Sequence, residues 1–145
     1  MPRVEIRFPA THEGFAKGFE QLRSALDVER LEGAPRYNAE LVFEEIVANI
    51  VEHGAVGGRI LDVRVTLETL HDSVILTFDD DGVAFDPRGL ADPVPSKSLE
   101  EAKIGGFGLM LVRHAASSLD YVRTAAGRNQ LRVKVPRAAA SAPGS

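Results

Sequence analysis

Three consecutive carboxylates close an apolar segment near the middle of the chain. Asp79, Asp80 and Asp81 follow the segment "VILTF" and precede Gly82. Clustered carboxylates repel one another unless one of them is used or all are well solvated. A carboxylate fixed at a strand end could accept a hydrogen bond from an exocyclic amine, and Gly82 would let a flat ligand approach the backbone closely. The pattern therefore indicates a candidate site for a flat ligand that carries an amine.

A second candidate site is a group of glycines that leads into a predicted helix. Gly105, Gly106 and Gly108 lie at the start of "GGFGLMLVR". Free N–H groups at a helix N-terminus, together with the helix dipole, form an anion site that suits phosphate oxygens. The glycines match neither a Walker loop, since no Lys-Ser or Lys-Thr pair follows, nor a Rossmann fingerprint, since a long polar loop precedes them. Taken alone, they could serve only a tight turn.

A third candidate is a polar ridge within an apolar helix. Glu45, Asn49 and His53 recur at four-residue intervals in "FEEIVANIVEHG", residues 43–54. At 3.6 residues per turn, the three side chains align along one side of the helix. Because the ridge follows the edge of the apolar stripe, we expect it either to pack against a neighbour or to line a cavity.

The elements that must position these residues follow from hydrophobic periodicity. Alternation of apolar and polar residues predicts strands over 3–8, 59–69, 73–80, 120–125 and 130–136. Helical spacing predicts helices over 12 to about 31, roughly 39–53 and about 107–118, with Thr11 and Asn38 as N-caps and residues 32–38 as a loop. This order predicts an α+β two-layer sandwich: a mixed, mostly antiparallel sheet with three helices on one face.

The chain length of 145 residues is that of one domain, which we place at residues 1–136. Residues 87–106 lack periodicity and contain three prolines, which favours a functional lid over this segment. The small-residue segment 137–145 is expected to be a disordered tail.

Composition narrows the classes of function. A net charge of −4 gives no general attraction to nucleic acid or to an anionic membrane. The absence of cysteine excludes disulfides and thiolate metal sites. The chain shows neither a signal peptide nor an apolar run of membrane-spanning length. A cytoplasmic location, with no direct nucleic-acid or membrane partner, is therefore the default expectation.

Together, the three motifs resemble a known family. An E-x-x-x-N pair on a helix, a strand ending D-x-G-x-x-F-D-P and a loop ending G-G-x-G-L occur in this order. Residues from about 4 to 136 closely resemble the GHKL ATP-binding fold, a Bergerat-type fold shared by gyrase B subunits, heat-shock chaperones and histidine kinases. Within it, the small size resembles the anti-sigma-factor serine/threonine kinases of the RsbW and SpoIIAB group.

The resemblance implies roles for the polar ridge. Asn49 would be the sole protein ligand of Mg²⁺, with phosphates and water supplying the other oxygens. Glu45, one turn earlier, would be the general base that takes a proton from an attacking hydroxyl. His53 is expected to be structural.

The resemblance also implies an ATP site. Asp80 would bind the adenine amino group, Gly82 would shape that pocket, and Gly106, Gly108 and the N–H of Leu109 would hold phosphates. Asp79 and Asp81 are then expected to be only solvated. In the lid, Lys97 and Lys103 are expected to be solvated as well, although they could reach phosphate.

The chain departs from the family pattern at two places. Many members have a second glycine in the adenine loop, and here that position is Ala84. A threonine that supports adenine in larger relatives has no clear match near Asn129 and Gln130.

The expected function is that of an ATP- and Mg²⁺-dependent protein serine kinase. By resemblance, its substrate would be a serine on an anti-anti-sigma (STAS) protein, and it would also sequester a sigma factor; a homodimer would be compatible with this. The alternative is a non-catalytic module in which ATP only orders the lid and a regulatory partner is bound. The catalytic half of a histidine kinase is disfavoured, because no dimerisation helix pair with a phosphoacceptor histidine precedes the first strand.

Overall fold

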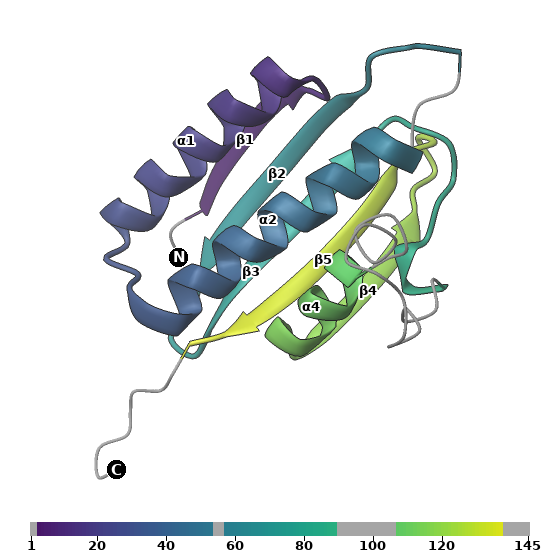
Figure 1. Cartoon of the computed structure of the whole chain (residues 1–145). Helices are drawn as coiled ribbons and strands as arrows, with labels where there is room; N and C mark the ends of the chain where they lie inside the picture. The colour runs from purple at the N-terminus through teal and green to yellow at the C-terminus, as the bar shows by residue number, and fades with distance from the viewer. Residues whose placement is uncertain (1–2, 54–56, 90–106, 138–145) are drawn as a thin grey trace, which may run out of the picture.

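The computed structural model describes residues 3–53, 57–89 and 107–137 (Figure 1). Within them the elements are β1 (Arg3–Pro9), α1 (His12–Val28), α2 (Gly33–His53), β2 (Asp62–Thr69), β3 (Ser73–Asp80), a 3₁₀ turn η1 (Pro87–Gly89), α4 (Phe107–Ala115), β4 (Ser118–Arg123) and β5 (Asn129–Pro136). Most of the proposed lid and nearly all of the proposed tail lie outside the described residues, as do Gly106, Lys97 and Lys103. No described helix is long and apolar enough to cross a membrane.

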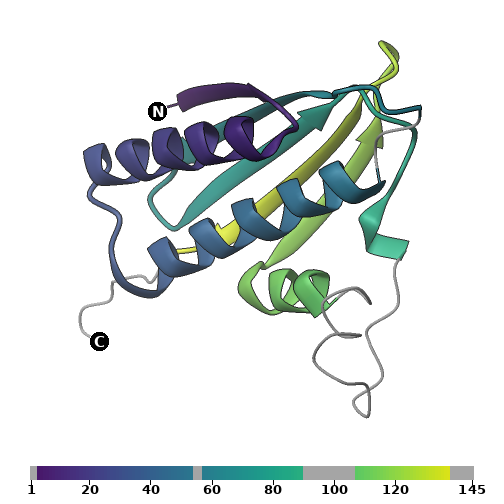
Figure 2. The same ribbon diagram turned by 45° about the horizontal axis from the view of Figure 1, so that its top comes forward.

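The five strands form one sheet in the order β1-β2-β3-β5-β4. All four described pairings are antiparallel. Helices α1, α2 and α4 lie on one face of this sheet, as Figures 1 and 2 show. The predicted two-layer α+β sandwich is therefore confirmed. The register places the end of β3 beside the start of β5, with Asp80 opposite Asn129.

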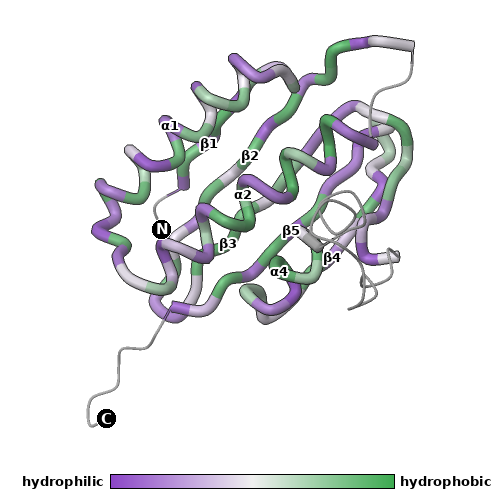
Figure 3. The backbone as a smooth tube through the Cα atoms, in the orientation of Figure 1, coloured by the Kyte–Doolittle hydropathy of each residue, from purple (hydrophilic) through white to green (hydrophobic). Residues whose placement is uncertain are grey.

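The core lies between the sheet and the helices. Along β2, buried residues alternate with half-buried ones, and apolar and polar residues alternate in the same way in Figure 3. Phe43 of α2 is fully buried and its ring lies 5.8 to 6.2 Å from the rings of four other phenylalanines, Phe8, Phe15, Phe19 and Phe78. Helix α2 is thereby fixed over the middle of the sheet, and its polar ridge comes to lie beside the end of β3.

The first helix begins as predicted. The hydroxyl of Thr11 accepts a hydrogen bond from the N–H of Gly14 at 2.9 Å, which caps the N-terminus of α1. The helix ends at Val28, three residues before the predicted end, and Arg30 follows with a left-handed φ of 57°. Such a residue stops a helix, because continuing it would require a right-handed backbone.

The second helix begins earlier than predicted. It starts at Gly33, so the prediction of a loop over 32–38 with Asn38 as the N-cap is wrong. Pro35 lies in the first turn, where a backbone N–H has no intrahelical partner and proline is tolerated. Arg36 stabilises this turn, because its guanidinium donates hydrogen bonds to Asp27 of α1 and, at 2.9 Å, to Glu40. The extra turns depend on this tertiary contact, which hydrophobic periodicity does not reveal.

Candidate functional site

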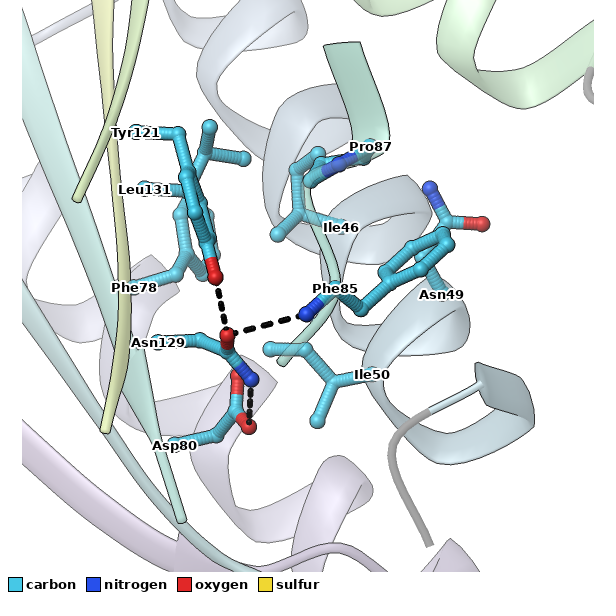
Figure 4. Close-up of a pocket in the computed structure, with 10 residues that line it drawn as sticks. All are labelled: Ile46, Asn49, Ile50, Phe78, Asp80, Phe85, Pro87, Tyr121, Asn129 and Leu131. Atoms are coloured by element: carbon cyan, nitrogen blue, oxygen red, sulfur yellow. Dashed lines mark hydrogen bonds between the residues drawn. The ribbon is translucent and has the colours of Figure 1, made fainter. Parts of the chain in front are cut away.

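A small cavity lies where α2 faces the ends of β3 and β5 (Figure 4). It is lined by Ile46, Asn49, Ile50, Phe78, Asp80, Phe85, Pro87, Tyr121, Asn129 and Leu131. Most of these side chains are apolar, and a few polar groups converge among them, which is the usual character of a small-molecule site. The structure therefore brings Asp80 and Asn49 together, as the sequence motifs suggested.

Asp80 is the buried carboxylate of this cavity, with 5% of its surface exposed. Its Oδ1 accepts hydrogen bonds from the N–H of Gly82 at 2.8 Å and from the side-chain amide of Asn129 at 3.0 Å. Burial raises the pKa of Asp80, while the two hydrogen bonds oppose that increase. Both donors are neutral, so the carboxylate is oriented without being neutralised.

Asn129 is a cavity residue that the sequence analysis did not assign. It is also 5% exposed, and it lies at the first position of β5, directly opposite Asp80. Strand alternation could have found it: Leu131, Val133 and Val135 face the core, so position 129 must face the same way. A polar residue at a strand position whose side chain should face the core is the sequence signal that could have identified Asn129.

The cavity is closed on its outer side by the loop after β3. Phe85 lines it, and its ring stacks on His53 with centroids 4.7 Å apart. His53 thus has a packing partner, in line with its expected structural role. The cavity volume is about 30 Å³, room for only a few water molecules and far below the usual few hundred Å³ of a ligand pocket. A purine would therefore enter only if the side chains of Phe85 and the neighbouring Pro87 moved aside.

Asn49 carries a buried amide nitrogen with no hydrogen-bond partner among the described residues. Such a group is costly in a folded protein and commonly marks a place where a ligand or ion completes the contacts. The choice between amide oxygen and nitrogen rests on the hydrogen-bond network, so an unpaired amide can present its oxygen instead. The described residues include no group of three or more His, Cys, Asp or Glu that could hold a metal. Asn49 therefore fits Mg²⁺ only in the manner of a single protein ligand beside phosphates and water.

Glu45 lies one turn from Asn49 but lines a different hollow. This groove, lined by Thr11, His12, Phe15, Glu44, Glu45, Val47, Ala48 and Val51, has a volume of about 410 Å³ between the start of α1 and α2. Burial raises the pKa of Glu45, and the adjacent charge of Glu44 raises it further. The polar ridge thus runs from the small cavity at Asn49 to the larger and more open groove at Glu45.

The start of α4 lies against Glu45. A Cβ atom added to Gly108 would lie 1.9 Å from Oε1 of Glu45, so any side chain at this position would displace the carboxylate of Glu45. The side chain of Leu109 is 1% exposed and belongs to the core, which leaves only its backbone N–H for binding. The N–H groups of the first helical turn have no intrahelical acceptor. Gly108, one of the predicted phosphate-binding residues, therefore lies beside Glu45, the predicted base.

Asp79 and Asp81 are not merely solvated, so that expectation is wrong. Asp79 forms ion pairs with Arg128 and, at 3.6 Å, with Arg64. Asp81 accepts a hydrogen bond from the N–H of Asp62 at 2.8 Å and pairs with Arg59 at 3.1 Å. The cations come from other strands and loops, which explains why the local sequence gave no sign of them.

Comparison with known proteins agrees with this geometry. A family model of the histidine kinase-like ATPase domain matches residues 8–135. The serine/threonine-protein kinase BtrW of Bordetella bronchiseptica is 35% identical over 88 residues, which are 61% of this chain and 62% of that protein. The chain thus matches less than two thirds of the length of that relative.

Two solved structures share the fold. The RsbU and RsbW domains of Rv1364c from Mycobacterium tuberculosis give a TM-score of 0.63 at 18% identity, covering 99% of this chain and 35% of that one. The SiaB-SiaC complex from Pseudomonas aeruginosa gives a TM-score of 0.60 at 12% identity, covering 92% and 89%. The family match runs from β1 to β5 and includes the cavity, the groove and the start of α4. The chain belongs to the histidine kinase-like ATPase domain family.

Proposed function

We propose that this protein is an ATP- and Mg²⁺-dependent protein serine kinase of the anti-sigma-factor type. It would phosphorylate a serine on an anti-anti-sigma (STAS) partner and sequester a sigma factor. The observation that carries the proposal is the arrangement along α2: Asn49 lines the cavity that holds Asp80, and Glu45 lines an open groove one turn away. The kinase name of the 35%-identical relative supports the same activity.

The cavity would hold the adenine end of ATP. Asp80 supplies an oriented acceptor for the adenine amino group, and apolar side chains such as Ile50 and Leu131 supply surfaces for the ring. The phosphates would extend along α2 towards the N–H groups of Gly108 and Leu109, which suit anionic oxygens. Asn49 lies between these two ends, where its amide would ligate a Mg²⁺ ion that neutralises phosphate charge.

The groove would admit the acceptor serine. As the serine oxygen bonds to the γ-phosphorus, its proton passes to the carboxylate of Glu45. The bond from the γ-phosphorus to its bridging oxygen breaks, and ADP leaves with that electron pair. The raised pKa of Glu45 suits this role, because it makes the carboxylate a stronger base.

Two substitutions on the polar ridge test the assignment. Glu45→Gln keeps the shape of the side chain and removes the base, so phosphotransfer should fall by about 10²–10⁴ while ATP affinity stays within a few fold. Asn49→Ala should weaken metal-dependent ATP binding and abolish turnover together. Transfer is measured with γ-labelled ATP and candidate STAS proteins, and affinity by calorimetry with and without Mg²⁺.

The result separates the two candidate functions. Glu52→Gln is the matched control, because it makes the same change at an exposed position of α2 outside the groove and should retain phosphotransfer. Wild-type rates in Glu45→Gln would rule out Glu45 as the base. A wild type that binds ATP and its partner but transfers no phosphate would instead support the non-catalytic switch module.

A further inference from the structure

The amide of Asn129 is the most heavily used polar group in the cavity. Its Nδ2 donates to Oδ1 of Asp80 at 3.0 Å and to the carbonyl of Val83 at 2.7 Å. Its Oδ1 accepts from the N–H of Phe85 at 3.1 Å and from the hydroxyl of Tyr121. Three of these contacts are visible in Figure 4. A side-chain amide has two N–H donors and two lone pairs, so all of its capacity is used within the protein.

These contacts permit only one orientation of the amide. Turning it over would place the NH₂ group against the N–H of Phe85 and the oxygen against two acceptors, on Asp80 and Val83. Asn129 thus offers Asp80 a fixed N–H donor and has no free group of its own to bind a ligand.

The consequence falls on the second oxygen of Asp80. Oδ1 receives two N–H groups, from Gly82 and Asn129, whereas no described residue donates to Oδ2. The carboxylate of Asp80 is therefore held in one orientation, and its Oδ2 remains available to accept a hydrogen bond from a ligand. A base that meets this oxygen must bring a donor, such as the 6-amino group of adenine. A 6-oxo purine would bring a carbonyl oxygen and leave two acceptors facing each other, which is heavily penalised in a desolvated site.

We propose that Asn129 is the positioning residue that sets the base selectivity of this site. By occupying Oδ1 of Asp80, it keeps Oδ2 available and makes the cavity accept 6-amino purines and reject 6-oxo purines. The inference rests on the proposed ATP site and goes beyond it, because it assigns the selectivity to a residue that does not itself touch the base.

The test compares ATP with ITP, which differs in carrying a 6-oxo group, by calorimetry on the intact protein. The wild type should prefer ATP by about 10- to 100-fold. Asn129→Leu keeps the approximate size and removes both donors, so its ATP affinity should fall at least about tenfold while its ITP affinity changes little. Gln130→Leu is the matched control: it makes the same exchange of an amide for an apolar side chain at the next residue, which faces the other side of β5, and should keep the preference.

The ratio of the two affinities is the decisive readout. If Asn129→Leu weakened the binding of both nucleotides equally, Asn129 would only hold the loop in place and the inference would be overturned. If that variant failed to fold, as judged by circular dichroism, the exchange Asp80→Asn with Asn129→Asp restores one carboxylate and one amide. This exchange should fold yet lose the preference, and a retained preference would overturn the inference. A wild type that binds ATP and ITP equally would refute the inference alone, whereas a wild type that binds neither would refute the ATP site itself.

Discussion

The end of β3 presents neighbouring carboxylates to two opposite environments. Asp80 turns towards the helices, into the cavity, and only the neutral donors of Gly82 and Asn129 hydrogen-bond to it among the described residues. Asp79 and Asp81 turn the other way and are paired with arginines. The same residue type in one short run therefore serves in one case as an uncompensated acceptor and in the other as half of an ion pair.

The pKa shifts record this difference. Burial raises the pKa of Asp80. Burial also acts to raise the pKa of Asp81, but the hydrogen bonds from Asp62 and Arg59 outweigh it and lower the pKa overall. A charge that the fold neutralises contributes to stability, whereas a charge that the fold only orients costs stability and stays available for a ligand. Removing the charge of Asp80 should therefore weaken ligand binding without lowering stability, whereas removing the charge of Asp79 should lower stability without weakening ligand binding.

The largest effect is expected for Asp80→Asn. The amide would keep an oxygen towards Gly82 and Asn129 but turn N–H donors towards the adenine amine, so ATP affinity should fall about tenfold to a hundredfold. The melting temperature should stay the same or rise, because a buried charge is removed. Asp79→Asn is the matched variant, and it should lower the melting temperature while retaining ATP affinity. Calorimetry and thermal melts on both variants check this. Equal changes of ATP affinity and melting temperature in the two variants would contradict the proposed difference between Asp80 and Asp79.

A second effect, on stability and not on nucleotide binding, is expected for Arg128→Ala, which removes the main cation of the outer side. The Arg128 side chain is 16% exposed, pairs with Asp79, and contacts both the carboxylate and the carbonyl of Asp62. Its loss should lower the free energy of unfolding by about 1–3 kcal/mol and leave ATP binding in place. Arg132→Ala makes the same charge change at an exposed position of β5 and should be nearly neutral. Urea unfolding measures the free energy of unfolding of both variants. Equal destabilisation would show that the ion pairs of Arg128 contribute no more to stability than an exposed arginine does.

The smallest effect is expected for the loss of stability at acidic pH. The hydrogen bond from Arg7 lowers the pKa of Asp62, so Asp62 contributes stability above its unfolded pKa, near 3.9, that is lost as the pH falls through the lower folded value. Asp80 has the opposite sign: its raised pKa means that stability is gained as the pH falls through the folded value. Asp62→Asn should therefore flatten the acid limb of the melting temperature between roughly pH 5 and 2. The effect should be modest, because Arg7 is largely exposed and solvent screens the pair. An unchanged acid limb would contradict the assignment.

Much of this molecule follows from local sequence rules. Alternating residues specify β2 and β5, because each of these strands has one buried and one wetter face. Thr11 caps α1 because its hydroxyl reaches an N–H within its own turn. The spacing of Glu45, Asn49 and His53 placed all three half-buried along one edge of α2, as expected. These features depend on contacts within a few residues of each other, which a sequence displays directly.

Tertiary structure decided what depends on distant partners. The early start of α2 rests on Arg36 reaching Asp27 of the preceding helix. Asn129 meets Asp80 only because β5 pairs with β3 in one particular register, across 49 positions of sequence. The cations that pair with Asp79 come from β2 and from the turn before β5. A hydrogen bond or ion pair requires two groups within about 3–4 Å of each other, and for residues far apart in the chain only the packed sheet and helices bring them that close.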